Sequence, residues 1–192
     1  MYKTFYLFRH GETDYNLEKR WQGCSVDSIL NPNGIKQAKD LADKLQNSQI
    51  QIIYSSELKR ALQTSSIVAA NLDVPLYTIA ALREGNLGGA EGLLVSEVET
   101  KYPDIFKSWY SDENDMQISF PGGETKQQMQ DRMFNVLMYL LDTPQETIGI
   151  CSHGSSIRYL LMKFGIMPHR MINTARYKIC YCNGNWTAER LD

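Results

Sequence analysis

The chain has 192 residues, of which 43% are hydrophobic and 22% are charged, and its formal net charge is −2. This length and composition are typical of one globular domain whose core needs neither a disulfide nor a metal. Acidic and basic residues are balanced and no basic run occurs, so the sequence lacks the positive patch that is typical of nucleic-acid-binding proteins. No apolar run is long enough to span a bilayer, and no signal-peptide core precedes Arg9. We therefore expect a cytoplasmic protein that binds neither nucleic acid nor membrane.

Four short apolar runs predict strands, at Thr4–Phe8, Ile50–Ser56, Pro75–Ile79 and Thr147–His153. At the end of the chain, residues 176–182 and 185–190 predict a strand pair across the turn signal Asn183-Gly184.

Helical periodicity separates these strands. It predicts helices over Asn31–Asn47, Glu57–Leu72, Thr125–Asp142 and Ser155–Gly165. The apolar face of the first should comprise Ile35, Ala38, Leu41, Ala42 and Leu45. We expect Ser55 or Ser56 to cap the second helix and Thr125 to cap the third.

Alternating strands and helices predict an α/β fold, a three-layer α/β/α sandwich with a mostly parallel central sheet. Residues 85–123 are rich in glycine, acidic and aromatic residues, with short helical pieces around Val95–Lys101 and Ile105–Tyr110. We expect a single domain over residues 1–192 in which about 85–123 form an inserted, partly helical subregion.

Polar residues follow the predicted strands at the point where each strand ends. In parallel sheets, ligands bind beyond the carboxyl ends of the strands. The residues expected at this edge are Arg9, His10, Arg60, Glu84 and His153.

This set of side chains suits phosphoryl transfer. The guanidinium groups of Arg9 and Arg60 can bind phosphate oxygens, and their charge favours a neutral, nucleophilic imidazole. Glu84 is our candidate for protonating the leaving oxygen and then activating water. Glu12 and Glu57 compete for that role, and the glycines at 11 and 154 allow close backbone approach.

Each of these residues has an ordinary structural alternative. A lone arginine more often forms a surface ion pair, and a lone histidine at a strand end more often makes a structural hydrogen bond. Their grouping on one edge favours a site instead. We expect no site role for His169, which follows a proline in a loop.

Cysteine spacing gives little sign of a metal site. The four cysteines are Cys24, Cys151, Cys180 and Cys182. The last two would face the same side of a strand, which makes a metal half-site conceivable, but no second thiol or histidine pair completes it. We expect free thiols, no metal and no cofactor.

Five segments resemble the histidine phosphatase superfamily, also called the phosphoglycerate-mutase-like family, in family order over nearly the whole chain. They are FRHGETDYN, YSSELKRALQTS, LREGNLGGAEG, PGGET and CSHGSSIR. The resemblance implies a metal-free phosphohistidine mechanism with His10 as nucleophile and Glu84 as proton donor. It also implies that Arg9, Arg60 and His153 bind the phosphoryl oxygens. Further phosphate-binding residues would be Thr13, Asn16, Gln22, Gly23 and Gly154.

One departure from the family pattern bears on the reaction. In the cofactor-dependent phosphoglycerate mutases an arginine follows the proton-donor glutamate, whereas Gly85 follows Glu84 here. No arginine lies between Arg83 and Arg132, so the insert lacks the cations that retain a phosphoglycerate. Its aromatic residues suit a less charged leaving group or form the core of the insert. They are Tyr102, Phe106, Trp109 and Tyr110.

We therefore expect a metal-independent phosphomonoesterase of the histidine acid phosphatase type, acting on a small phosphorylated metabolite. The alternatives are a cofactor-dependent phosphoglycerate mutase, which is an isomerase, and a non-catalytic phosphate-binding module. Sugar phosphates, nucleotides, cofactor-precursor phosphates and phosphoprotein segments all stay open as substrates. We expect a monomer or a homodimer.

Overall fold

A six-stranded sheet forms the centre of the chain in the computed structural model, which describes residues 1–110, 115–167 and 171–191. In the sheet the strand order is β3-β2-β4-β1-β5-β6, and only β5 runs against the other strands. The strands are β1 (Tyr2–Arg9), β2 (Ile52–Ser55), β3 (Leu76–Thr78), β4 (Thr147–Ser152), β5 (Arg176–Cys182) and β6 (Asn185–Arg190). The predicted strands and the final strand pair are thereby confirmed.

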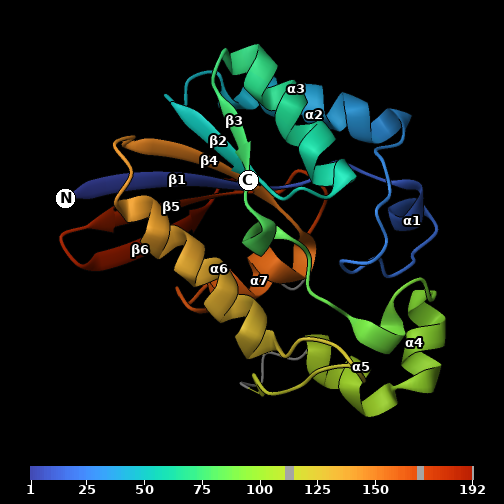
Figure 1. Cartoon of the computed structure of the whole chain (residues 1–192). Helices are drawn as coiled ribbons and strands as arrows, with labels where there is room; N and C mark the ends of the chain where they lie inside the picture. The colour runs from blue at the N-terminus through green and yellow to red at the C-terminus, as the bar shows by residue number, and fades with distance from the viewer. Residues whose placement is uncertain (111–114, 168–170, 192) are drawn as a thin grey trace.

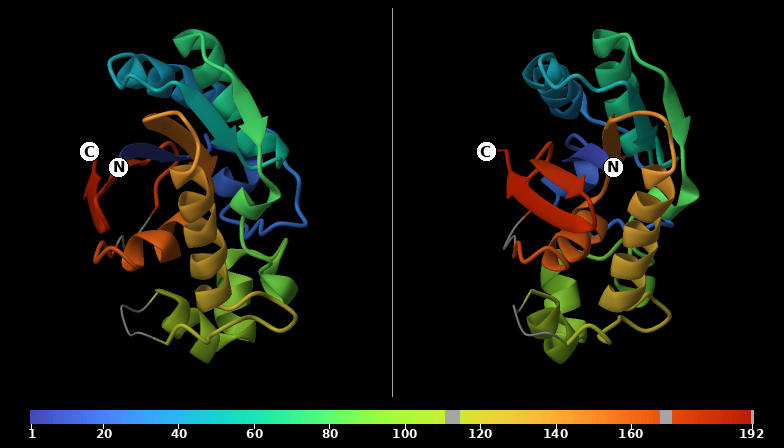
Figure 2. Two further views of the ribbon diagram at one scale, coloured as in Figure 1. Left: turned by 60° about the vertical axis from the view of Figure 1, so that its left-hand side comes forward. Right: turned by 90° about the vertical axis from the view of Figure 1, so that its left-hand side faces the viewer.

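Helices cover both faces of the sheet, with α2 and α3 on one face and α6 and α7 on the other (Figures 1 and 2). This arrangement confirms the predicted three-layer α/β/α sandwich. The helices are α1 (Asp14–Leu17), α2 (Pro32–Leu45), α3 (Lys59–Leu72), α4 (Val95–Lys101), α5 (Pro103–Tyr110), α6 (Lys126–Leu141) and α7 (Gly154–Met162). Two 3₁₀ turns, η1 (Ala80–Leu82) and η2 (Gly88–Ala90), follow β3.

Strand β1 supplies both halves of the core because successive side chains point to opposite faces of a sheet. Phe5 and Leu7 pack into the cluster shared with α6 and α7, whereas Phe8 packs with α2 and α3. All three side chains are fully buried. A strand buried on both faces reads as a continuous apolar run, so the change to Arg9 and His10 marks where the strand leaves the core.

The pairing of β1, β4 and β2 brings their carboxyl ends to one edge. Arg9 lies opposite Ser152, and Ser55 lies opposite Cys151. The residues that follow these strands, His10, Ser56 and His153, therefore emerge side by side.

The caps and faces of the helices differ from the sequence expectation at two places. Helix α2 buries Gly34 instead of Ile35, which is 41% exposed, because the backbone of Glu12 lies where a Cβ at position 34 would stand. The N-cap of α3 is Leu58, without a side-chain cap, so the prediction of Ser55 or Ser56 is wrong. The expected cap at Thr125 is confirmed, since its side chain accepts a hydrogen bond from the N–H of Gln128.

The segment between β3 and α6 carries η2, α4 and α5 and extends away from the sheet (Figure 1). Its aromatic side chains mostly form a separate cluster in which Trp109 and Phe120 are at most 2% exposed. Most of these aromatic side chains therefore form the core of the insert, as one of the two expectations from the sequence had it. Assignment of residues 85–123 to one inserted part of a single domain stays a prediction.

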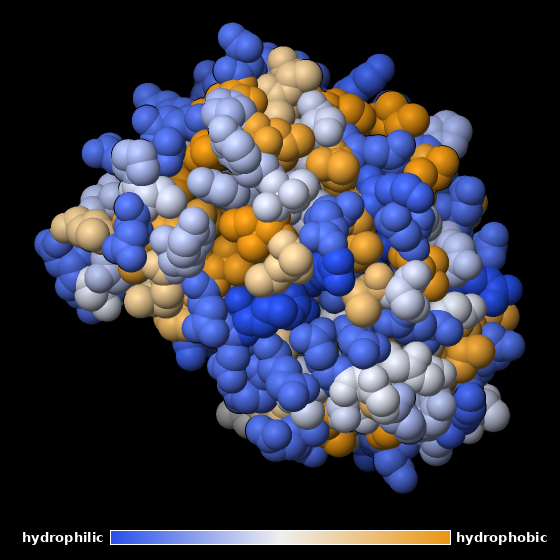
Figure 3. Space-filling model, in the orientation of Figure 1, coloured by the Kyte–Doolittle hydropathy of each residue, from blue (hydrophilic) through white to orange (hydrophobic). Residues whose placement is uncertain are grey.

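The surface between β3 and α6 shows apolar side chains within a mostly hydrophilic face (Figure 3). Half-buried Tyr54, Ile79 and Ala81 pack against the core cluster. No helix in the described residues is long and apolar enough to cross a membrane. All four cysteines are free, and His169 lies outside the described residues.

Adjacent positions on α6 offer a test of the core. Leu140 is fully buried and Tyr139 is 67% exposed. Leu140→Ala should lower the free energy of unfolding by about 2–5 kcal/mol, because it removes buried methyl groups and leaves a cavity. Tyr139→Ala should change it by no more than about 0.5 kcal/mol. Urea unfolding measures both, and equal effects would contradict this packing.

Candidate active site

A cavity of about 780 Å³ opens at the carboxyl edge of the sheet. Its volume lies within the range of about 300–1,000 Å³ that small-molecule sites occupy. Four of the five predicted edge residues line it, namely Arg9, His10, Arg60 and Glu84, together with Asn16, Gln22, Gly23 and Gly154. Beyond them the wall includes Trp21, Trp109 and Tyr110, so the insert forms its outer side.

His10 is held with one ring nitrogen directed at the protein. Its Nδ1 lies 2.7 Å from the carbonyl oxygen of Gly11. A carbonyl can only accept, so Nδ1 carries the proton and Nε2 keeps its lone pair. Burial, followed by the charges of Arg9 and Arg60, lowers the pKa of His10 well below the ordinary value. A neutral imidazole with a free Nε2 is the form that a nucleophile requires.

Arg60 is fully buried and lies in the first turn of α3. Nη1 donates to the carbonyl of Val26 and Nη2 to the carbonyl of Gly23, both at 2.7 Å, and Nε donates to Nδ1 of His153 at 3.2 Å. A guanidinium has five N–H donors, so two remain for a ligand. Arg9, whose Nη1 donates to the carbonyl of Met171, lines the same cavity.

His153 stands behind Arg60, with its ring centroid 5.1 Å from that of His10. The arginine donates to Nδ1, so the proton lies on Nε2, which donates to Oγ of Ser56 at 2.8 Å. Both ring nitrogens thus have protein partners, and His153 is fully buried outside the cavity lining. Burial, followed by Arg60, lowers its pKa well below the ordinary value. Direct phosphate binding by His153 stays a prediction.

Glu84 lies at the N-terminus of α7, where backbone N–H groups are left without helical partners. One carboxylate oxygen accepts from the N–H of Ser155 at 3.1 Å, and the other accepts from the N–H of Ser156 at 3.0 Å. The Ser156 hydroxyl and the Gly85 N–H add two further bonds. These donors fix the carboxylate beside Gly154 on the cavity wall.

Glu12 and Glu57, the two other candidates for the proton donor, are less well placed than Glu84. Glu57 forms an ion pair with Arg83 on the surface and does not line the cavity. Glu12 lines the cavity, but one of its oxygens accepts from the side-chain amides of Asn31 and Asn33. Glu84 therefore remains our candidate for the proton donor, and this role stays a prediction.

The side-chain amides of Asn16 and Gln22, which were predicted to bind phosphate, accept hydrogen bonds from the protein through their oxygen atoms. The Asn16 oxygen accepts from the N–H and the hydroxyl of Thr13 and from Asn173, and the Gln22 oxygen accepts from Ser28. Their NH₂ groups are thus left to donate to a ligand. Thr13 caps α1 and is fully buried, and it does not line the cavity.

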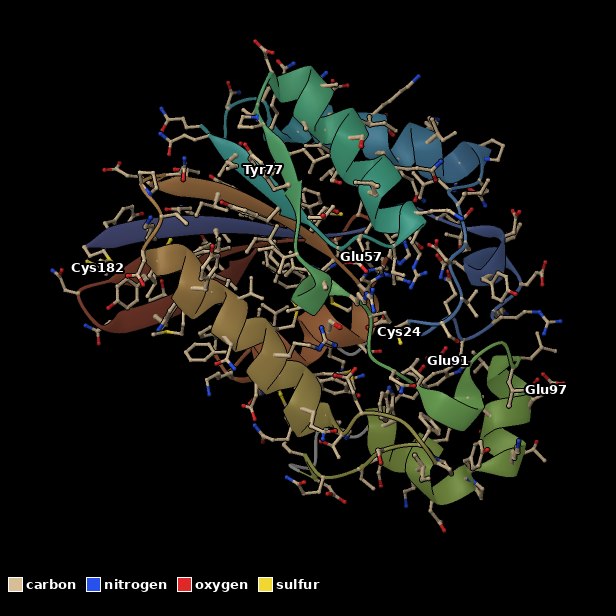
Figure 4. All side chains as sticks on the ribbon, viewed as in Figure 1. Cys24, Glu57, Tyr77, Glu91, Glu97 and Cys182 are labelled. Carbon is tan, nitrogen blue, oxygen red and sulfur yellow. The ribbon has the colours of Figure 1, made fainter. Side chains whose placement is uncertain are left out.

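The loop that carries Gly23 is tied to the insert through Glu91. The Glu91 carboxylate accepts from the backbone N–H groups of Cys24, Ser25 and Leu87. Cys24 and Glu91 lie close together where the insert meets the rest of the chain (Figure 4). Gly23 has φ +60°, and a Cβ there would overlap the Glu91 side chain, so glycine is favoured at this position. The insert therefore helps to position the carbonyl that holds Arg60.

Gly85, the departure from the mutase pattern, has a packing reason. A Cβ at this position would overlap Sδ of Met129. The structure therefore leaves no room for a larger side chain next to Glu84 unless Met129 moves.

Sequence reasoning missed several residues that line the cavity, among them Trp21, Arg158 and Asn173. Asn173 donates to the carbonyl of His10 and to the side-chain oxygen of Asn16. It lies between the last helix and β5, where no pattern marked it. Arg158 lies four residues after Gly154, so helical geometry places it on the same face one turn later. This spacing could have identified Arg158 from the sequence.

The two buried imidazoles predict how stability depends on pH. Their lowered pKa values mean that the unfolded chain takes up protons that the folded chain excludes. The free energy of unfolding should therefore fall as pH drops below about 6.5, by up to about 1.4 kcal/mol per pH unit for each histidine. In urea titrations between pH 7.5 and 5.5, His10→Asn and His153→Asn should each flatten this slope. A wild-type stability that does not fall over this range would contradict the burial of neutral imidazoles.

Comparison with known proteins identifies the family. The model of the histidine phosphatase superfamily (branch 1) matches residues 5–192. Phosphoglycerate mutase-like protein 4 of Arabidopsis thaliana is 36% identical over 162 residues, 83% of this chain and 70% of the relative. A metal-independent phosphoserine phosphatase of the same plant is 32% identical over 160 residues, 82% of this chain and 66% of the relative.

A solved structure agrees. A phosphoserine phosphatase variant from Entamoeba histolytica, in complex with phosphoserine, superposes with a TM-score of 0.79 at 27% identity, covering 99% of this chain and 95% of that one. The predicted class, a phosphoric monoester hydrolase, is thereby confirmed. The chain belongs to the histidine phosphatase superfamily.

Proposed function

We propose that this chain hydrolyses small phosphate monoesters through a phosphohistidine on His10, without a metal ion. One observation carries the assignment of the nucleophile. The Nδ1–H of His10 is engaged by the Gly11 carbonyl at 2.7 Å, which leaves Nε2 with a free lone pair beside Arg9 and Arg60.

In the first step, Nε2 of His10 attacks phosphorus and the bond from phosphorus to the ester oxygen breaks. The leaving oxygen takes the proton of Glu84 and departs as a free alcohol. The remaining Nδ1 proton stays on its bond to Gly11, so the phosphorylated ring carries a positive charge that the phosphoryl oxygens balance.

In the second step, the Glu84 carboxylate takes a proton from water while the water oxygen attacks phosphorus. The N–P bond breaks, inorganic phosphate leaves, and both His10 and Glu84 return to their starting states. One residue thus serves as acid and then as base, as a double displacement requires.

The arginines supply the charge that a metal provides in other phosphatases. Arg9 and Arg60 line the cavity, and in this proposal they donate to the phosphoryl oxygens throughout the transfer. The relative named a metal-independent phosphoserine phosphatase supports this reading. Chelation of divalent metals should leave turnover of p-nitrophenyl phosphate intact, and loss of activity in excess chelator would contradict the proposal.

A mutase is the second candidate, because the similar proteins include a probable phosphoglycerate mutase of Proteus mirabilis, 32% identical over 190 residues. In a mutase the alcohol would stay bound, reorient and take the phosphoryl group back from His10. Interconversion of 3- and 2-phosphoglycerate much faster than phosphate release would favour this reaction over hydrolysis.

A variant at position 10 tests the nucleophile. His10→Ala should abolish both turnover and any acid-labile, alkali-stable phosphate on the protein, since His10 is the only histidine that lines the cavity in the described residues. Rapid quench with radiolabelled substrate measures the adduct. The matched variant His153→Gln should still form it, at a reduced rate. An adduct on His10→Ala would contradict the assignment.

Glu84→Gln tests the proton donor through the leaving group. Hydrolysis of alkyl phosphates should fall by about 10²–10⁴-fold, because their alkoxide leaves poorly without a proton. p-Nitrophenyl phosphate needs no such proton, so it should give one rapid equivalent of nitrophenol followed by slow turnover. The control Glu57→Gln, on the surface, should change either rate by less than about twofold. Equal losses on both substrates without a burst would contradict the role of Glu84.

A further inference from the structure

A buried arginine forms part of the cavity wall beyond the phosphate pocket. Arg158 is 6% exposed and lines the cavity together with Gly154 and Ser155. These positions share one face of α7, and Arg158 stands four residues, about 6 Å along the helix axis, beyond Gly154. Arg158 therefore lies on the cavity wall about one helical turn beyond Gly154.

Few groups in the described residues balance the positive charge of the Arg158 guanidinium. Nη2 donates to the carbonyl of Tyr110 at 3.1 Å, and the group lies 5.7 Å from the centre of the Tyr110 ring. Nε is buried without an acceptor, and no carboxylate of the described residues forms an ion pair with Arg158. Lys126 adds a second buried cation nearby, whose pKa is lowered by burial and by the charge of Arg158. Buried charge without a partner is costly, so this arrangement favours an incoming anion.

A second residue on the cavity wall, Trp21, also carries a donor without an acceptor. The indole Nε1 of Trp21 is buried and makes no hydrogen bond, and Trp21 is 7% exposed. The Trp21 and Tyr110 rings pack edge to face at 6.1 Å, so Trp21 and Arg158 both contact the same tyrosine. Two buried N–H donors without acceptors thus belong to side chains that contact one aromatic ring and line the cavity.

We propose that this pair, Arg158 and Trp21, binds a carboxylate on the leaving group, so that the substrate is the phosphate monoester of a small hydroxy acid. The inference rests on the proposed phosphatase function and adds the substrate class. A carboxylate fits because its two oxygens match the planar guanidinium fork and its single charge balances one arginine. A second phosphate would bring more charge than one arginine can balance.

This site also changes what the lack of arginine in the insert implies about the substrate. The arginine that such a substrate needs is absent from residues 84–131 but comes from α7, which the fold brings against Tyr110 of the insert. Lack of arginine in the insert therefore does not exclude an anionic leaving group.

Substrate pairs that differ at the carboxylate test the proposal. We expect wild-type kcat/KM to be at least about tenfold higher for O-phosphoserine than for O-phosphoethanolamine, and likewise for 3-phosphoglycerate over glycerol 3-phosphate. Arg158→Gln should bring both ratios close to one, Arg158→Lys should keep part of the preference, and Trp21→Phe should lower the ratios by a few fold. Persisting turnover of glycerol 3-phosphate shows that a variant is folded. If Arg158→Gln does not fold, Arg158→Lys and Trp21→Phe carry the test.

Arg20→Gln is the matched control, since Arg20 also lines the cavity but is already bonded to Glu18 and to the carbonyl of Gly92. It should leave the ratios within about twofold of wild type. Wild-type ratios near one, or a preference that all the Arg158 and Trp21 variants retain, would overturn the carboxylate site while leaving the phosphatase intact. Failure to hydrolyse any of the four esters and p-nitrophenyl phosphate would instead overturn the proposed function.

Discussion

The buried guanidinium of Arg60 is the interaction on which the site depends. It joins the start of α3 to the carbonyls of Gly23 and Val26 and to the ring of His153 at the end of β4. Glu91 holds the same loop from the side of the insert. One fully buried cation thus links sheet, helix, loop and, through that loop, the insert. Such a group is stable only because three acceptors meet it, and removing any of them leaves a buried donor without a partner.

Burial, together with the charge of Arg9 and Arg60, also keeps the imidazoles of His10 and His153 neutral, because it lowers their pKa values. Arg60 can donate to Nδ1 of His153 only if that nitrogen has no proton, so the neutral form is built into the packing. His10 is kept neutral by burial and by Arg9 and Arg60. The same cations that would hold the phosphoryl group therefore help to keep the proposed nucleophile, His10, neutral, so that no further base would be needed to deprotonate it.

Most of the fold and the inner part of the site were predictable from the sequence. Apolar runs that end in Arg9-His10 or Ser152-His153 locate strand ends, and parallel strands bring those ends together. Contacts between segments without periodicity were not predictable. Asn173 and Trp21 lie outside regular elements, and the role of Arg158 depends on how the insert docks on α7. The burial of Gly34 instead of Ile35 likewise depends on a close backbone approach that no helical period records.

The central claim is that phosphoryl transfer passes through His10, and the configuration at phosphorus tests it most directly. Two successive in-line displacements each invert phosphorus. With a phosphate monoester made chiral by oxygen isotopes and a suitable acceptor alcohol, a phosphohistidine intermediate predicts net retention of configuration in the transferred phosphoryl group. Net inversion would show a single displacement by the acceptor and would contradict a phosphohistidine intermediate.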